Sequence, residues 1–189
     1  MSNLTTKSWT LPVQAYFSGL KFKFRWQRMV QLLAELLVVL SLSFLSYFLI
    51  SRFVLQSVSV SGPSMLPNLV NHGSYFVNRL AYVTHDPERM DVVEARDPQD
   101  GTLVVKRIIG LPGESLYFKH GKVFVNGHPL SEPYLSPGMP TYAYEKSEDE
   151  FICVGANQYY VLGDNRNNST DSRSFGPVSR DDILGKIIH

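Results

Sequence analysis

Hydrophobic positions divide the chain into two parts with different patterns. Residues 29–51 form an almost unbroken apolar stretch, MVQLLAELLVVLSLSFLSYFLIS, in which Glu35 is the only charged residue. From residue 56 onward the apolar runs are short, and turn-forming residues recur between them. A membrane-spanning helix needs about 20 mainly apolar residues, so the first part is long enough to cross a bilayer. The second part has the pattern of a strand-rich globular domain.

The short apolar runs predict a mainly β domain at residues 56–189. In SLYFKHGKVFVNG two alternating runs meet at KHGK, which predicts a hairpin turn. Several strands separated by turns favour an antiparallel, barrel-like β domain. Residues 128–150 are rich in proline and charge, and we expect an excursion or long surface loop there. The runs that predict strands are SVSV, SYFVNR, MDVVEA, LVVKRIIG, SLYFKHGKVFVNG, EFICVG and YYVLGD.

The residues on either side of the apolar stretch favour a retained membrane anchor. A buried core helix and a cleaved signal peptide are the two alternatives. Residues 1–28 carry five Lys and Arg and no acidic residue, which places them in the cytoplasm by the positive-inside rule. The sequence that follows, SRFVLQSVSV, lacks a small-x-small cleavage site. We therefore expect a single-pass protein of the cell membrane, with a cytoplasmic segment 1–28, an anchor at 29–51 and an extracytoplasmic domain at 56–189.

Composition narrows the function classes. The 18 Lys and Arg balance 17 Asp and Glu, which gives a formal charge of +1. A chain without an excess of basic residues does not indicate nucleic-acid binding. The single cysteine, Cys153, rules out an internal disulfide or a cysteine-based metal cluster, and its apolar surroundings predict a packed core thiol. The five histidines show no ligand spacing. We expect neither a metal nor an organic cofactor.

One lysine stands where the pattern predicts a buried strand. In TLVVKRIIGLPG, Val104, Lys106 and Ile108 share one face because side chains alternate along a strand. Burying an ammonium among apolar side chains is costly. Two interpretations follow: a lysine that reaches solvent from a strand edge, or a lysine whose pKa is lowered by desolvation so that it can act as a base.

Two other stretches offer groups that such a base could serve. SGPSMLPNL, residues 61–69, holds Ser64 between two prolines; this is either a simple turn or the site of a nucleophile, which needs a base. GDNRNNSTDSRSFGPV, residues 163–178, is either a solvated loop or one that positions catalytic groups. The alternating charges in it that suggest an ion-pair brace are Asp164, Arg166, Asp171 and Arg173.

Together with the anchor, these three stretches resemble the type I signal peptidases of bacteria and organelles, peptidase family S26. The family pattern reads S-M-x-P, then K-R-x-x-G-x-P-G-[DE], then G-D-N-R-x-x-S-x-D-S-R. This chain has SMLP at 64–67, KRIIGLPGE at 106–114 and GDNRNNSTDSR at 163–173. The resemblance runs from the anchor to about Ile188, and residues 128–150 are its loosest part. It implies a membrane-anchored serine endopeptidase that removes signal peptides from exported preproteins through an acyl-enzyme.

The resemblance implies a role for each matched position. Ser64 would be the nucleophile, and its backbone N–H would supply one oxyanion donor. Lys106 would be the general base and later the acid that protonates the leaving amine. Ser169 matches the serine that hydrogen-bonds the lysine and orients it. The residues that match the supporting ion pairs are Arg107, Asp164, Asp171 and Arg173.

A few positions depart from the family pattern. Gly62 replaces a serine that helps to bind the oxyanion in many Gram-negative members, so a backbone group or water would substitute. Asn68 replaces the usual threonine and Glu114 the usual aspartate; we expect both to leave the chemistry unchanged. Lys106 separates the chain from the endoplasmic-reticulum branch, which has histidine there.

The anchor would belong to the mechanism. Ser64 follows the apolar stretch by only about ten residues, which places it near the bilayer surface where signal-bearing preproteins are tethered, and sharing the bilayer raises the effective concentration of both partners. The export translocon is a further candidate partner in the same membrane. The small-x-small end of the signal would add as an extended strand beside an exposed edge. The side chains expected to line its pockets are Val60, Met65, Leu69 and Val105.

Two other function classes remain open from the sequence. A Ser-Lys autoprotease of the SOS-repressor type has a related β fold, but it lacks a membrane span and normally carries a DNA-binding module. An inactive membrane-tethered binding module would leave Ser64 and Lys106 without a role. Cleavage of a preprotein by the wild type, and its loss on substitution of either residue, separates the three.

Overall fold

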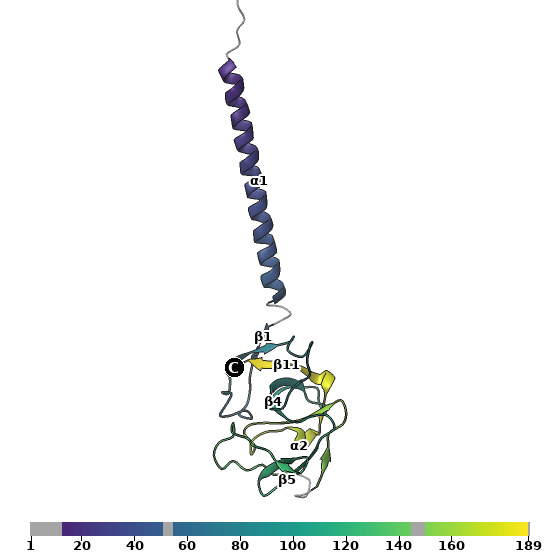
Figure 1. Ribbon diagram of the computed structural model, residues 1–189. Helices are drawn as coiled ribbons and strands as arrows, with labels where there is room; N and C mark the ends of the chain where they lie inside the picture. The colour runs from purple at the N-terminus through teal and green to yellow at the C-terminus, as the bar shows by residue number, and fades with distance from the viewer. Residues whose placement is uncertain (1–12, 51–54, 145–149, 189) are drawn as a thin grey trace, which may run out of the picture. The chain divides into compact units, whose positions relative to one another are not determined.

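The computed structural model describes residues 13–50, 55–144 and 150–188 (Figure 1). The chain separates into two compact units, Met1–Leu49 and Ile50–His189. The first contains one long helix, α1 (Val13–Leu49), and the part Trp26–Leu49 is long and apolar enough to cross a membrane, with a mean hydropathy of 2.2. This helix begins well before residue 29, and residue 51, the expected end of the anchor, lies outside the described residues.

The second unit is mainly β, as the sequence predicts. A seven-stranded sheet in the order β1-β2-β11-β3-β4-β9-β10 curls into a half-barrel, and a four-stranded sheet has the order β7-β6-β5-β8 (Figure 1). The described strand pairs are antiparallel. The strands are β1 (Leu55–Ser59), β2 (Ser74–Asn78), β3 (Val92–Arg96), β4 (Leu103–Gly110), β5 (Ser115–Lys119), β6 (Lys122–Val125), β7 (His128–Pro129), β8 (Ile152–Cys153), β9 (Gln158–Leu162), β10 (Val178–Ser179) and β11 (Ile183–Ile188).

Each of the seven predicted runs overlaps one or two strands. The predicted hairpin at KHGK joins β5 to β6, and its two central residues, His120 and Gly121, have φ angles of 50° and 72°. Positive φ at both positions is what a type I′ turn requires, and this turn matches the twist of the paired strands.

The C-terminal part of the domain holds elements that the sequence reading missed. The strand β11 lies inside the large sheet between β2 and β3, although ILGKII has a glycine at its centre. A Cβ at Gly185 would lie 2.7 Å from the carbonyl oxygen of Asn78, so the close approach of β11 to β2 needs glycine. Two short helices, α2 (Ser172–Phe175) and the 3₁₀ turn η2 (Arg180–Asp182), flank β10.

The prediction for the side chain of Cys153 is wrong. Cys153 was expected in the core, but its thiol is exposed. In β8 the side chains of Ile152 and Cys153 point to opposite faces, and it is Ile152 that packs into the core of the small sheet.

A buried apolar cluster lies beneath the loop that carries Ser64. It joins residues of that loop to side chains of β2, β3, β4 and β11, so the loop rests on the sheet rather than standing free. The cluster consists of Val60, Met65, Leu69, Val77, Val92, Val105 and Ile187.

Candidate active site

Ser64 and Lys106 meet although 42 positions separate them in the sequence. The Nζ of Lys106 donates a hydrogen bond to the Oγ of Ser64 at 3.0 Å. Lys106 comes from the middle of β4, and Ser64 comes from the loop after β1. The pair therefore has the distance that proton transfer between a nucleophile and its base requires.

Burial favours the neutral form of Lys106, the only form that can accept a proton. Only 4% of the residue is exposed, and its Nζ has a second acceptor in the carbonyl of Val105 at 3.1 Å. Desolvation disfavours the ammonium and lowers the pKa of Lys106, whereas the negative charges of Asp171, Asp97 and Asp164 oppose this shift. Because desolvation is the larger effect, the pKa lies below the ordinary lysine value.

The loop that carries Ser64 is fixed by hydrogen bonds to distant residues. The backbone N–H of Asn165 donates to the carbonyl of Ser64 at 2.9 Å, and the Asn165 side-chain amide donates to the carbonyl of Pro63 at 3.2 Å. The N–H of Gly62 donates to Oδ1 of Asn71 at 2.8 Å. Gly62 has a φ of 110°, a conformation that residues with side chains rarely adopt.

Ser169 lies at the same site, but it does not make the bond expected from the resemblance. Its Oγ is buried and has no hydrogen-bond partner among the described residues, so a bond to Lys106 is not formed in this structure. A Cβ at Gly163 would lie 2.1 Å from that Oγ and 2.6 Å from the carbonyl oxygen of Ser64. Glycine at 163 thus allows the loop of Ser169 to pack against the loop of Ser64.

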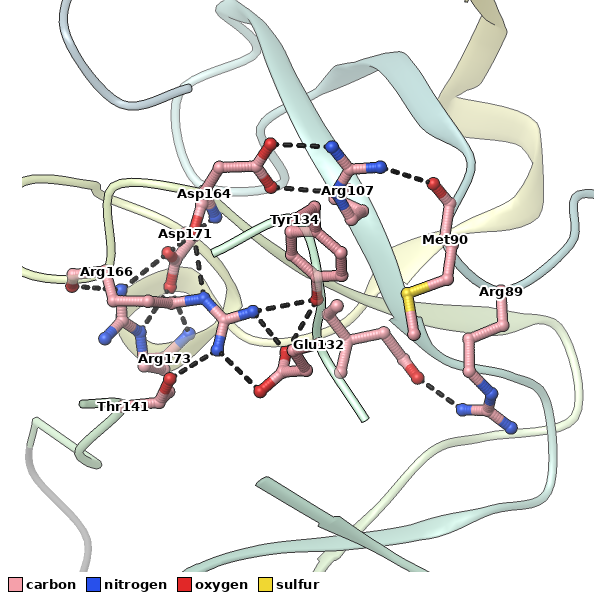
Figure 2. Close-up of polar contacts among 12 residues, drawn as sticks. Arg89, Met90, Arg107, Glu132, Tyr134, Thr141, Asp164, Arg166, Asp171 and Arg173 are labelled. Atoms are coloured by element: carbon pink, nitrogen blue, oxygen red, sulfur yellow. Dashed lines mark hydrogen bonds and ion pairs between the residues drawn. The ribbon is translucent and has the colours of Figure 1, made fainter. Parts of the chain in front are cut away.

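Two buried ion pairs support this arrangement. Arg107 points away from Lys106, as strand alternation predicts. Its guanidinium donates hydrogen bonds to both carboxylate oxygens of Asp164, at 2.8 and 2.7 Å (Figure 2). The Arg173 guanidinium likewise donates hydrogen bonds to both carboxylate oxygens of Asp171, each at 2.8 Å. Bidentate pairs of this kind fix orientation as well as charge, and they connect β4 to the 163–173 segment and hold that segment in shape.

The segment 128–144 completes the brace, which the sequence reading did not foresee. Arg166 is 1% exposed, and its guanidinium pairs with the Glu132 carboxylate and donates to the hydroxyls of Tyr134 and Thr141 (Figure 2). The segment expected as a surface excursion thus turns these three side chains inward, although only Thr141 is fully buried. In the sequence, this contact is indicated only by Arg166 itself. An arginine that is buried within the 163–173 motif needs an acceptor from another part of the chain.

Tyr144 links the end of this segment to the loop of Ser169. Its hydroxyl donates to the carbonyl of Ser169 at 2.9 Å, and the Arg173 guanidinium lies 4.2 Å from the centre of its ring. We expect Tyr144→Phe to lower the free energy of unfolding by about 1 kcal/mol because it removes this donor and keeps the ring. Thermal denaturation measures the change.

Tyr142→Phe is the matched control for Tyr144→Phe. The bond that Tyr142 makes to Arg173 uses its backbone carbonyl, which is retained. Equal melting temperatures for the Tyr144→Phe protein and the wild type would contradict a role for the Tyr144 hydroxyl.

Two cavities adjoin Ser64 and Lys106. The larger, of about 550 Å³, extends from the two residues towards the 167–170 loop, where Ser169 and Tyr144 line it. The smaller, of about 330 Å³, is a groove between the end of β1 and the start of β4. This groove is lined by Val58, Ser59, Val60, Ser61, Ser64, Glu94, Leu103, Val104, Val105 and Lys106.

The expected pocket residues divide into two groups. Val60 and Val105 line the groove. Met65 and Leu69 are fully buried in the apolar cluster beneath Ser64 and line neither cavity, so their assignment to a pocket is wrong. Both side chains point into the core from the loop that carries the Ser64 hydroxyl.

The start of β4 offers a free strand edge to this groove. Residues 103–106 pair with β3 on one side, whereas the described pairing of β4 with β9 begins only at Arg107. Within the described residues, no three His, Cys, Asp or Glu side chains are placed to hold a metal ion.

Comparisons with known proteins agree with the motifs. A family model described as signal peptidase, peptidase S26, matches residues 32–189. Signal peptidase I of Leptolyngbya laminosa is 36% identical over 147 residues, covering 74% of this chain and 70% of its own. Signal peptidase I P of Bacillus subtilis subsp. natto is 38% identical over 144 residues, covering 73% of this chain and 77% of its own.

A solved structure of a signal peptidase I from Enterococcus faecalis V583 is also similar. It is 32% identical, covers 55% of this chain and 97% of its own, and has a TM-score of 0.46. The extent of the family match and the identity to the curated relatives lead to one conclusion: this chain belongs to the signal peptidase family, peptidase S26.

Proposed function

We propose that this protein is a membrane-anchored serine endopeptidase that removes signal peptides from exported preproteins with a dyad of Ser64 and Lys106. Family membership supports a peptidase that removes signal peptides. The observation that carries the dyad is the 3.0 Å contact between the Ser64 hydroxyl and the desolvated amine of Lys106.

Acylation begins with neutral Lys106. Its amine takes the proton of the Ser64 hydroxyl as Oγ attacks the carbonyl carbon of the scissile bond, which gives a tetrahedral oxyanion. The ammonium of Lys106 then donates that proton to the leaving amine. The C–N bond breaks, the mature protein leaves, and the signal peptide stays on Oγ as an ester.

Deacylation repeats these steps with water. Lys106, neutral again, accepts a proton from a water molecule that attacks the ester carbonyl. The C–Oγ bond breaks, and Lys106 returns the proton to Ser64 Oγ. The free acid of the signal peptide leaves, and the enzyme is restored.

Neighbouring groups would support these steps without reacting. The backbone N–H of Ser64 is our candidate for one oxyanion donor. Gly62 has no hydroxyl to offer a second, and its own N–H is already bonded to Asn71, so the second donor would be another backbone group or water. Ser169, whose unpaired hydroxyl lies at the same cavity as Lys106, is our candidate for an acceptor that orients the lysine.

The free edge of β4 supports an extended binding mode for the substrate. A peptide lying along residues 103–106 would form main-chain hydrogen bonds and place alternate side chains in the groove. The groove is bounded by Val60 and Val105 and opens on Ser64, so small side chains next to the scissile bond would fit there. The α1 helix would hold the enzyme in the bilayer that also holds the signal segment, with residues 1–28 in the cytoplasm and the β unit outside. The export translocon is a candidate partner in that membrane.

The two alternative functions are not favoured. A soluble autoprotease of the SOS-repressor type has no use for the long apolar helix. An inactive binding module has no reason to keep a desolvated lysine in contact with a serine hydroxyl, because burial of that amine costs stability.

Cleavage by the whole chain tests the proposed function. The full-length protein in detergent micelles is incubated with a model preprotein that ends its signal in a small-x-small sequence. We expect cleavage immediately after that sequence, and N-terminal sequencing of the product locates it. Absence of cleavage under conditions in which the protein is folded would overturn the proposal.

The pH dependence tests the state of Lys106. Only the neutral amine can accept the Ser64 proton, so kcat/KM rises with pH as Lys106 loses its proton. Because burial lowers the pKa of Lys106, the rise is centred below the ordinary lysine value of about 10.4. A profile of kcat/KM that stays flat from acid to alkaline pH would contradict lysine as the base.

A further inference from the structure

A buried carboxylate lies in the wall of the groove beside Ser64, and the mechanism above does not use it. Glu94 is 2% exposed and lines the groove together with Val60 and Val105. Along β3 it follows Val93 and precedes Ala95, both fully buried. Burying an acidic side chain in such a run lowers stability unless its charge has a partner.

The partner of Glu94 satisfies it only in part. The guanidinium of Arg79 lies 2.8 Å from Oε2 of Glu94, which balances its charge. Arg79, however, directs its Nε and Nη2 hydrogen bonds to the Gln56 side chain at 3.2 and 2.8 Å. Among the described residues, Oε2 of Glu94 receives no hydrogen bond. The carboxylate is therefore neutralised but retains unused acceptor capacity.

Facing residues leave room for the Glu94 side chain at this position. In the sheet Glu94 pairs with Val105 on β4 and with Gly185 on β11. Gly185 contributes no side chain, and Val105 is itself part of the groove wall. A substrate side chain that enters the groove thus meets apolar surface, serine side chains and one carboxylate, that of Glu94.

We propose that Glu94 is a specificity-determining residue that lets this groove accept a small hydroxyl side chain, serine, next to the cleavage site by accepting its hydrogen bond. This inference rests on the proposed function, since it names the substrate side chain that the groove takes. The carboxylate lies in the groove wall with one oxygen, Oε2, that receives no hydrogen bond from the described residues. A purely apolar occupant leaves the carboxylate without a donor, whereas a serine hydroxyl supplies one.

Charge and size favour a neutral donor over a basic one. The Arg79 guanidinium already balances Glu94, so a lysine or arginine of the substrate would meet a like charge a few ångströms away. The groove, of about 330 Å³, must also hold the backbone of the substrate. A short side chain with one donor fits both conditions.

The test compares three full-length preproteins that differ only at the two small positions of the small-x-small sequence. One has alanine at both positions, and each of the others has serine at one of them. We measure kcat/KM for each with the wild type, Glu94→Val and Glu94→Gln. Asp86→Asn is the matched control because it removes a carboxylate whose side chain is 86% exposed.

We expect the serine-to-alanine ratio of kcat/KM to fall about 10-fold or more in Glu94→Val at one of the two positions. Glu94→Gln keeps the shape and a weaker, neutral acceptor, so its ratio falls less. Asp86→Asn keeps the wild-type ratio. If Glu94→Val does not fold, the ratio in Glu94→Gln decides.

Ratios within twofold of the wild type at both positions, in whichever Glu94 variant folds, would overturn the role of Glu94. That result leaves cleavage of the alanine preprotein by the wild type intact, so the proposed function survives it. If the wild type cleaves none of the three preproteins, the proposed function fails, and this inference fails with it.

Discussion

Replacing Lys106 by methionine lowers kcat/KM for preprotein cleavage by about 10⁴-fold or more, and replacing Ser64 by alanine has an effect of similar size. Methionine keeps the length and the apolar contacts of the buried lysine stem but cannot accept a proton. Alanine at 64 removes the oxygen that would form the ester in the proposed mechanism. In the proposed mechanism the two groups act as one unit through their 3.0 Å contact, so we expect the double variant to lose little more activity than either single variant.

Lys106→Arg separates a base from a fixed positive charge. Arginine keeps the cation but cannot be deprotonated in a protein, so we expect this variant to be as inactive as Lys106→Met. The matched controls are Lys122→Met and Ser57→Ala, which remove an exposed lysine and an exposed serine from other strands. Cleavage is followed by gel with all variants checked for folding by circular dichroism. Wild-type rates in Lys106→Arg would mean that residue 106 acts as a cation and not as a base.

Site residues could be predicted from the sequence only where the residue type and its immediate neighbours along the chain were informative. Lys106 stood out because an amine in an apolar strand contradicts the pattern, and the structure places its Nζ on the hydroxyl of Ser64. Alternation along β4 also predicted correctly that Arg107 faces away from Lys106. These are local rules, which depend only on neighbours along one strand.

Predictions failed where the answer depends on a partner from a distant part of the chain. Met65 and Leu69 were expected to line a pocket, but which face of their loop is buried is decided by β2, β3, β4 and β11 beneath it. Glu132 and Thr141 looked like parts of a surface loop, although they satisfy the buried Arg166. No periodicity within a proline-rich stretch indicates a contact of this kind.

Glu94 is a residue of the groove that the sequence did not single out. It lies in a run that was correctly read as a strand, and a strand reading alone treats it as a polar residue of the solvent face. Only the curl of the sheet turns this face into the groove beside Ser64. Curvature arises from twist summed over several strands, so a single strand of sequence does not reveal it.

Asp171→Ala lowers the free energy of unfolding by about 3–5 kcal/mol, the largest stability effect that we expect from a single substitution near the site. Asp171 is fully buried and accepts hydrogen bonds from Arg173 Nε and Nη2 and from the N–H of Gly163. Its side chain also caps α2 by accepting from the N–H of Arg173. Alanine leaves a guanidinium that is only 2% exposed without its counter-charge, and water cannot replace the lost bonds.

Asp182→Ala is the matched control, because Asp182 pairs with Arg96 at 3.7 Å on the surface, with side chains 34% and 49% exposed. A surface pair of this kind contributes at most about 1 kcal/mol. Urea denaturation of both variants measures the difference. Asp171 also raises the pKa of Lys106, so the pH profile of any activity that remains in Asp171→Ala moves to lower pH. Equal destabilisation by the two substitutions would show that the Asp171 carboxylate does not stabilise the fold through its ion pair. An unmoved pH profile in a folded Asp171→Ala protein would show that the carboxylate does not influence the pKa of Lys106.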